Sequence, residues 1–265
     1  MSADSKIGLL ATIDNDCYPH ISFITSIQPK GERQFIAGQF CAGLSKKNIL
    51  KRAKTGFLIL TPEMELWRGL LEYERSADSG PDFDMYNQRP LFRYNSYFGI
   101  GLVHYFRLID ISAKEQLSKG QIISGALKTR LVRPFVSKSV NGALNDLSSE
   151  MFKQLDGLKF IAWVNSSGYP LIIPLIQAAN AGRDRIAFSL SPYRQELEAI
   201  PDSAPVAVFF VNLKMESVLV KGTYRPGGGL IKHGLVDIKR VYNSMPPQPG
   251  YIYPKPIHHE KVISF

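Results

Sequence analysis

Residues 7–27 of the chain read IGLLATIDNDCYPHISFITSI, and residues 158–178 read LKFIAWVNSSGYPLIIPLIQA. The two stretches align without a gap at an offset of 151 residues, with Tyr18 on Tyr169 in the central turn. Identities are few, but apolar positions and turn residues coincide, and the offset still holds at the run GFLIL from Gly56. A unit of this length is too long for a solenoid repeat, so the sequence predicts two copies of one small domain.

The composition is that of a globular protein large enough for two domains. Of the 265 residues 45% are hydrophobic, and the formal net charge is +9. No apolar run is long enough to span a membrane, and the N-terminus has no signal-peptide pattern. Cys17 and Cys41 offer neither a disulfide framework nor metal-ligand spacing. We therefore expect a cytoplasmic protein without a metal site and without a membrane partner.

The positive charge favours an anionic partner. A phosphorylated cofactor and nucleic acid are both candidates, although the sequence has no zinc-finger spacing, helix-turn-helix signal or RNP-type aromatic motif. Many soluble proteins are equally basic without binding nucleic acid, so the charge by itself leaves a nucleic-acid-binding protein as an alternative only.

The first half consists of short β-rich runs separated by turn residues, with one helical interruption. We expect strands over residues 7–13, 20–28, 34–38, 56–60, 65–73 and 100–111. A helix is expected over 44–54, where Ser45 can cap its start. The polar and aromatic segment 74–98 is expected to form an inserted lid. Short strands joined by tight turns predict a mainly β protein with antiparallel barrels.

The domain organisation follows from the repeat. We expect a first barrel over residues 1–118, a helical linker over 119–150 and a second barrel over 151–265. After Tyr242 the sequence is rich in proline, and we expect this tail to lie extended on the surface without regular structure.

A polar cluster marks the start of the predicted helix, where Gln39 is followed by Ser45, Lys46, Lys47 and Asn48. A helix start presents free backbone N–H groups and the positive end of the helix dipole. Two lysines and a serine hydroxyl at that point suit a phosphate group. A solvated basic helix face has the same composition, and that alternative stays open.

The order of these motifs resembles the FMN-binding split β-barrel family, which includes pyridoxamine 5′-phosphate oxidase-related and flavin reductase-like proteins. The resemblance rests on Tyr18-Pro19-His20, GLSKKNIL from Gly43, GFLI from Gly56 and Trp67-Arg68-Gly69. It covers residues 7–71 well and residues 158–224 more faintly. No single motif is specific, and their order, spacing and repetition carry the resemblance.

The resemblance implies an FMN site in the first half. Ser45, Lys46 and Lys47 would hold the FMN phosphate, with Asn48 as a further donor. No catalytic residue is implied, and His20 is more readily a residue of a strand edge or turn than an acid–base group.

Further residues would line the flavin itself. Thr25 and Ser26 would contact the flavin or its ribityl chain, and Gln39 would reach the ring or ribityl edge. Arg68 would approach the ring or the phosphate. The alternatives are that Thr25 and Ser26 are ordinary outward strand residues and that Arg68 pairs with a surface carboxylate.

The second copy departs from the motif at the helix. The positions that correspond to Ser45–Asn48 are Glu196, Leu197, Glu198 and Ala199. Two carboxylates repel a phosphate, so we expect one FMN per chain and a second barrel kept for structure.

Members of the family form homodimers with flavin between two barrels, and the resemblance therefore implies a pseudo-twofold dimer inside one chain, with further dimerisation left open. Aromatic residues of the insertion or the tail, among them Tyr86, Tyr242, Tyr251 and Tyr253, could cover the flavin or simply pack between the barrels.

The leading function is an FMN-dependent oxidoreductase acting on a small molecule, since the flavin would supply the redox chemistry. Pyridoxamine phosphate oxidation is weaker, because a second phosphate site is not evident. A non-catalytic flavin, haem or deazaflavin binder and a basic nucleic-acid-binding protein remain alternatives.

Overall fold

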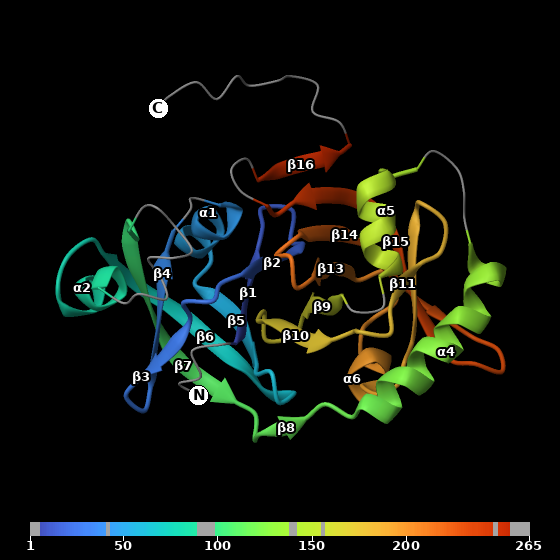
Figure 1. Cartoon of the computed structure of the whole chain (residues 1–265), viewed down its shortest axis with the longest axis horizontal. Helices are drawn as coiled ribbons and strands as arrows, with labels where there is room; N and C mark the ends of the chain where they lie inside the picture. Colours follow the sequence, from blue (N-terminus) through green and yellow to red (C-terminus); the bar gives the residue numbers. More distant parts are fainter. Residues whose placement is uncertain are drawn as a thin grey trace. The chain divides into compact units, whose positions relative to one another are not determined.

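The chain folds into two antiparallel β-sheets of eight strands each (Figure 1). The computed structural model describes residues 6–40, 43–88, 99–137, 142–154, 157–245 and 249–254. The strand order is β2-β1-β5-β6-β7-β4-β3 in the first sheet and β10-β9-β13-β14-β15-β12-β11 in the second. Each strand of the first order has its counterpart eight strands later, which confirms the expected mainly β fold with two tandem split barrels.

The elements of the first half are β1 (Ile7–Ile13), β2 (Pro19–Phe23), β3 (Gln28–Lys30), β4 (Gln34–Gln39), α1 (Leu44–Lys51), β5 (Lys54–Leu60), β6 (Glu65–Ala77), α2 (Pro81–Gln88), β7 (Leu102–Ile111) and β8 (Glu115–Gln116), which pairs with β6. Two helices follow, α4 (Lys119–Val136) and α5 (Asp146–Lys153). None of the helices that the structure describes is both long and apolar enough to cross a membrane.

The second half contains β9 (Leu158–Val164), β10 (Pro170–Pro174), β11 (Ala179–Asn180), β12 (Arg185–Ser189), α6 (Arg194–Glu198), β13 (Pro205–Val211), β14 (Ser217–Gly227), β15 (His233–Asn243) and β16 (Gly250–Tyr253), which pairs with β15. By their contacts the residues form two compact units. The first comprises Met1–Gln121, Phe160–Pro174 and Pro205–Ala207, and the second comprises Ile122–Lys159, Leu175–Ala204 and Val208–Phe265.

The same turn opens both halves. The carboxylate oxygen Oδ1 of Asp14 accepts from the backbone N–H of Tyr18 at 2.9 Å, and Oδ1 of Asn165 accepts from that of Tyr169 at 2.9 Å. Asp and Asn favour such turns because their short side chains bond to the backbone a few residues on. These paired residues therefore explain why the alignment is gapless here.

The predicted strand over residues 20–28 is wrong, because β2 ends at Phe23 and β3 begins at Gln28. In between, the chain crosses close over Gly8: Ile24 donates its N–H to the Gly8 carbonyl at 2.7 Å. A Cβ on Gly8 would lie 2.3 Å from the Ile24 carbonyl oxygen, so only glycine permits this crossing. The chain then pairs with β4 instead of continuing along β1.

Other predicted boundaries change as well. The helix ends at Lys51 instead of residue 54, and β6 continues to Ala77, inside the predicted lid. The rest of that lid contains α2, and residues 89–98 lie outside the described part of the chain. The expectation of an irregular tail is wrong for Gly250–Tyr253, because this stretch lies between the prolines and pairs with β15.

The two faces of the first sheet carry different cores. Phe35 and Ala37 of β4 face a cluster that Ile49 of α1 completes, whereas Ile36 faces a cluster around Tyr86 of α2. This alternation is the period of two expected along a strand. Helix α1 therefore covers one face and α2 the other, and Gln39 continues the row of Phe35 and Ala37.

Helix α4 covers the second sheet as α2 covers the first (Figure 1). Thr129 of α4 accepts from the backbone N–H of Ser189 at 2.8 Å, and Val136 packs on a cluster that includes Ala187 and Leu235. Gly125 allows close approach, because a Cβ there would lie 2.9 Å from the Ser191 carbonyl oxygen. The expected linker helix is thus a covering helix of the second unit.

Candidate functional site

The start of α1 has the features of an anion site. Gly43 precedes the helix in an extended conformation (φ −114°, ψ −175°) and makes no side-chain cap. The first turn contains no acidic residue, and a Cβ built on Gly43 meets no atom within 4 Å. The first backbone N–H groups of a helix lack intrahelical partners and carry partial positive charge, so this open end suits an anion.

Two hydroxyl groups meet at this end of α1. The side chains of Ser45 and of Ser22 on β2 are hydrogen-bonded to each other, and both residues are half-buried. Each hydroxyl can donate as well as accept, so the pair can turn its hydrogens toward an incoming anion.

Gln39 and His104 form a second part of the site, close enough to Lys46 for its charge to act on His104. Nε2 of His104 on β7 lies 2.9 Å from Oε1 of Gln39 at the end of β4. Because that amide oxygen only accepts, Nε2 carries the hydrogen and Nδ1 offers a lone pair. Nδ1 is buried and has no hydrogen-bond partner among the described residues.

The charge state of His104 follows from its surroundings. Burial, and secondly the positive charge of Lys46, lower the pKa of His104 to about 4. Only 7% of the residue is exposed, so the imidazole is neutral at pH 7. The site thus pairs a cation at the helix start with a neutral, buried hydrogen-bond acceptor. We call Ser22, Gln39, Ser45, Lys46 and His104 the α1 cluster.

The two remaining residues of the predicted phosphate motif differ in their surroundings. Lys47 is exposed on α1. Asn48 is buried, and its Nδ2 donates to Oγ1 of Thr12 on β1 at 2.9 Å. The amide of Asn48 therefore holds the helix against the sheet, and Lys47 is free of the core to meet an anion from the solvent side.

Thr25 and Ser26 lie in the turn after β2 and not on a strand. The hydroxyl of Ser26 is buried and donates to the Gly38 carbonyl at 2.7 Å, and the Ser26 carbonyl accepts from the Tyr86 hydroxyl at 2.6 Å. Thr25 is half-buried in the same turn. Ser26 thus ties the turn to β4 and α2.

Arg68 lies far from His104 of the α1 cluster. Its Nε donates to Oε1 of Glu115 on β8 at 2.8 Å, which is the carboxylate pairing that the sequence left open. Arg68 is eight residues along β6 from Ser76, the residue opposite His104. At about 3.3 Å per residue, this separation is roughly 26 Å, so Arg68 and His104 do not meet.

In the second half, apolar side chains stand at the positions of Gln39 and Lys46. Leu190 and Leu197 stand 151 residues after Gln39 and Lys46, and both are buried. Leu197 lies in α6, and its carbonyl accepts from the hydroxyl of Tyr224 at 3.1 Å. This hydrogen bond and the burial of Leu197 therefore hold the short helix against β14 of the same sheet.

The strand pairing extends this contrast. In the first sheet Ala37 is opposite His104, and in the second Phe188 is opposite Gly234. A Cβ on Gly234 would lie 2.4 Å from the Phe188 ring, which stacks on Tyr224 with 6.3 Å between ring centroids. An aromatic ring thus fills the space that corresponds to the imidazole of the first half.

The aromatic residues suggested as flavin covers are engaged in packing. Tyr86 is buried under α2, on the sheet face opposite Ala37. Tyr242 packs edge-on against Tyr251 with ring centroids 5.2 Å apart, and Tyr253 ends β16. Residues 89–98, the rest of the predicted lid, lie outside the described part of the chain.

Sequence reasoning missed Ser22 and His104. Ser22 had a weak signal, a polar residue between Ile21 and Phe23 on a strand beside the predicted helix. His104 had none, because only the pairing of β4 with β7 brings it to Gln39, 65 residues earlier.

Comparison with known proteins adds little detail. No family model and no curated protein matches the chain. The chain resembles the structure of an FMN-binding protein from Syntrophomonas wolfei at 18% identity, covering 42% of this chain and 78% of that one, with a TM-score of 0.36. It also resembles a putative pyridoxamine 5′-phosphate oxidase from Lactobacillus delbrueckii at 15% identity, covering 39% and 98%, with a TM-score of 0.31. A Bacillus subtilis inhibitor of motility covers 90% of this chain at 5% identity and a TM-score of 0.27. At these TM-scores the likeness carries no argument about function.

Proposed function

We propose that the first half of the chain binds FMN, with the phosphate at the start of α1. The observation that carries the proposal is the convergence of Ser45, Lys46 and an uncapped helix start with the hydrogen-bonded pair of Gln39 and the buried His104. A phosphate would receive donors from the backbone, from the hydroxyl groups of Ser22 and Ser45, and from the lysines.

The donor set fits a phosphorylated ring compound. The helix start offers positive charge and N–H groups for the phosphate, and the first turn adds no opposing carboxylate. Nδ1 of His104 is an acceptor that has no donor among the described residues, and a flavin ring carries polar groups that could satisfy it. Gln39 holds the imidazole in the tautomer that presents this lone pair.

The second half supports a single site per chain. At the positions equivalent to Gln39 and Lys46 it carries Leu190 and Leu197, which provide neither charge nor an acceptor, and at the position of Ser45 it carries the carboxylate of Glu196. Glu198 of α6 is paired with Arg194 and with Lys232, so the short helix presents a neutralised surface and not a phosphate cradle.

We further propose a flavin-dependent oxidoreductase acting on a small molecule. Bound FMN would supply the redox chemistry, and the chain would bind and orient it. A neutral His104 would add no positive charge to that of Lys46 in the site. NAD(P)H turnover with an electron acceptor would distinguish an enzyme from a non-catalytic flavin carrier.

The test is the visible spectrum and cofactor content of the purified full-length protein. We expect flavin bands and one FMN per chain. Replacing both lysines, Lys46→Ala with Lys47→Ala, should weaken FMN binding on the order of 100-fold, because each removes a charge-assisted contact. The matched control is Arg194→Ala on α6, which should leave occupancy unchanged.

Three results would contradict the proposal. They are full FMN occupancy in the double lysine variant, two FMN per chain, or a haem Soret band in place of flavin bands. Equal loss in the Arg194→Ala control would indicate a general loss of folding, which circular dichroism would reveal.

A further inference from the structure

The outward face of α4 is apolar. Ile123, Leu127, Leu131 and Phe135 are 62%, 59%, 62% and 90% exposed. Residues four apart lie on one side of a helix, so these side chains form a continuous stripe. The opposite side of α4, including Gly125, Thr129 and Val132, is buried against the second sheet.

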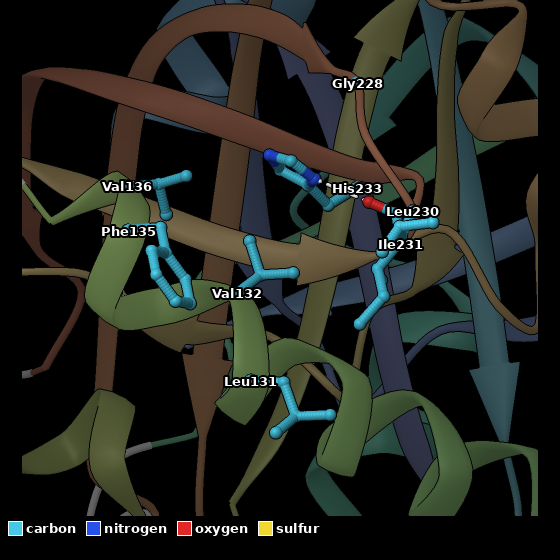
Figure 2. Close-up of a pocket in the computed structure, with 8 residues that line it drawn as sticks. All are labelled: Leu131, Val132, Phe135, Val136, Gly228, Leu230, Ile231 and His233. Atoms are coloured by element: carbon cyan, nitrogen blue, oxygen red, sulfur yellow. Dashed lines mark hydrogen bonds between the residues drawn. The ribbon is translucent and has the colours of Figure 1, made fainter.

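A loop beside α4 extends this apolar surface. Leu230, between β14 and β15, is fully exposed, and a hollow of about 300 Å³ separates the loop from the helix. Figure 2 shows Leu131 and Phe135 of α4 facing this hollow from one side, with Leu230 and Ile231 on the other. We call Ile123, Leu127, Leu131, Phe135 and Leu230 the α4 surface.

Positive charge flanks the stripe on both sides. Helix α4 contains Lys119, Lys128, Arg130 and Arg133 and no acidic residue. With 3.6 residues per turn, Lys128 and Arg130 fall on opposite edges of the stripe defined by Leu127 and Leu131. Both are exposed, and among the described residues neither forms an ion pair. The cations are therefore available to an external anion.

This charge pattern argues against a second copy of the chain as the occupant. A twofold interface places the same patch on itself, so the basic edges of one α4 would face those of the other without a carboxylate. Like charges repel in such an arrangement. The occupant must supply negative charge beside an apolar layer.

The shape argues against a peptide helix. The side chains of Phe135 and Leu230 protrude from two different elements, and the hollow between them is at the small end for even a drug-sized ligand. Protruding apolar groups with flanking cations suit the boundary between lipid headgroups and acyl chains.

We propose that the α4 surface binds an anionic phospholipid membrane, with α4 lying in the headgroup plane. The stripe and Leu230 enter the acyl boundary, and Lys128 and Arg130 contact lipid phosphates and carboxylates. The interaction is peripheral and independent of the flavin site, because it uses residues of the second unit only.

Vesicle co-sedimentation of the full-length protein tests this. Binding is expected to vesicles of phosphatidylcholine with phosphatidylserine, to weaken with salt, and to be absent with phosphatidylcholine alone. The variant Leu127→Ser with Leu131→Ser should lose at least about tenfold in binding, since both side chains insert. Both positions are exposed, so its unfolding midpoint should match that of the parent.

A charge variant isolates the electrostatic part. Lys128→Glu with Arg130→Glu should weaken binding by roughly 20-fold or more, because each basic residue near an anionic surface contributes about fivefold. Matched controls are Leu213→Ser and Lys214→Glu in the turn between β13 and β14, where Leu213 is 91% exposed. These controls should bind as the parent does.

The proposal is overturned if the parent protein does not co-sediment with anionic vesicles, or if it binds neutral vesicles equally well. Equal losses in the turn controls would also overturn it. So would a lipid-free dimer on size-exclusion chromatography that the Leu127→Ser, Leu131→Ser variant disrupts, because the occupant would then be a second copy.

Discussion

Helices α1 and α6 occupy corresponding places beside their sheets, but polar residues lie between α1 and its sheet, whereas apolar residues lie between α6 and its sheet. Lys46 of α1 corresponds to the fully buried Leu197 of α6, and Gln39 corresponds to Leu190. The second sheet shows that the fold closes stably with apolar residues at this end. Polar residues are therefore not required there for folding, and the first half retains them at a cost in desolvation. That difference is the strongest reason to look for a ligand at α1.

Other contacts are the same in both halves and identify the scaffold. Ser26 donates to the Gly38 carbonyl at 2.7 Å, and Gln177 donates to the Ser189 carbonyl at 2.8 Å, with both pairs 151 residues apart. Because different side chains make the same hydrogen bond in the two halves, this bond stabilises the turn and the strand end. Ser26 thus belongs to the shared scaffold more than to the α1 cluster.

The largest effect on stability is expected from removing the Phe188 ring from the core of the second half. Phe188 is fully buried and stacks on Tyr224. Phe188→Ala should lower the free energy of unfolding by about 3–5 kcal/mol, because it leaves a cavity, while FMN content stays unchanged. Urea unfolding and the flavin-to-protein ratio measure both. A loss of unfolding free energy under 1 kcal/mol, or loss of flavin without unfolding, would contradict the view that the second half is filled by apolar residues where the first half is polar.

Acid should affect the first half through His104. Its pKa is lowered to about 4 in the folded chain, whereas an unfolded histidine titrates at about 6.5. Above pH 6.5 both states are neutral. As the pH falls from 6.5 to 4, the unfolded chain takes up a proton and the folded chain does not, so unfolding becomes easier by up to about 3 kcal/mol.

The control for this prediction is His104→Leu, which gives the first half an apolar residue at that place. Urea unfolding at pH 7 and at pH 4.5 should show a smaller acid loss in the variant than in the parent. Equal acid losses in both proteins would show that His104 is not held neutral by burial.

A smaller and equal effect is expected at two matched glycines. A Cβ would lie 2.1 Å from the Asp110 carbonyl oxygen at Gly69 and 2.2 Å from the Asp237 carbonyl oxygen at Gly222. Gly69→Ala and Gly222→Ala should each cost about 1–3 kcal/mol of unfolding free energy, because the strands must move apart.

Thermal or urea midpoints measure this pair of substitutions. The control is Gly101→Ala, where a Cβ meets no atom within 4 Å. A large cost at only one of the two matched glycines would mean that the two halves share strand order without sharing close packing.

The reliable sequence predictions were those governed by short-range rules. The turn at Asp14 and Asn165, the strand β1 and the start of α1 follow from turn chemistry and local periodicity. The strand predicted over residues 20–28 failed, since its break depends on Gly8, which lies on another strand. Local patterns do not encode a close approach between strands.

The repeat at an offset of 151 residues, the mainly β character of both halves and the asymmetry between Lys46 and Leu197 can be derived from the sequence alone. They follow from residue type and from an offset that can be counted along the chain. Which polar residues share a site depends on tertiary contacts. In the folded chain Arg68 pairs with Glu115, and Asn48 donates to Thr12. The pairing of β4 with β7 places His104 beside Gln39. The physical reason is that strand pairing joins residues far apart in sequence, and the burial that neutralises His104 exists only once the sheet and α1 have come together.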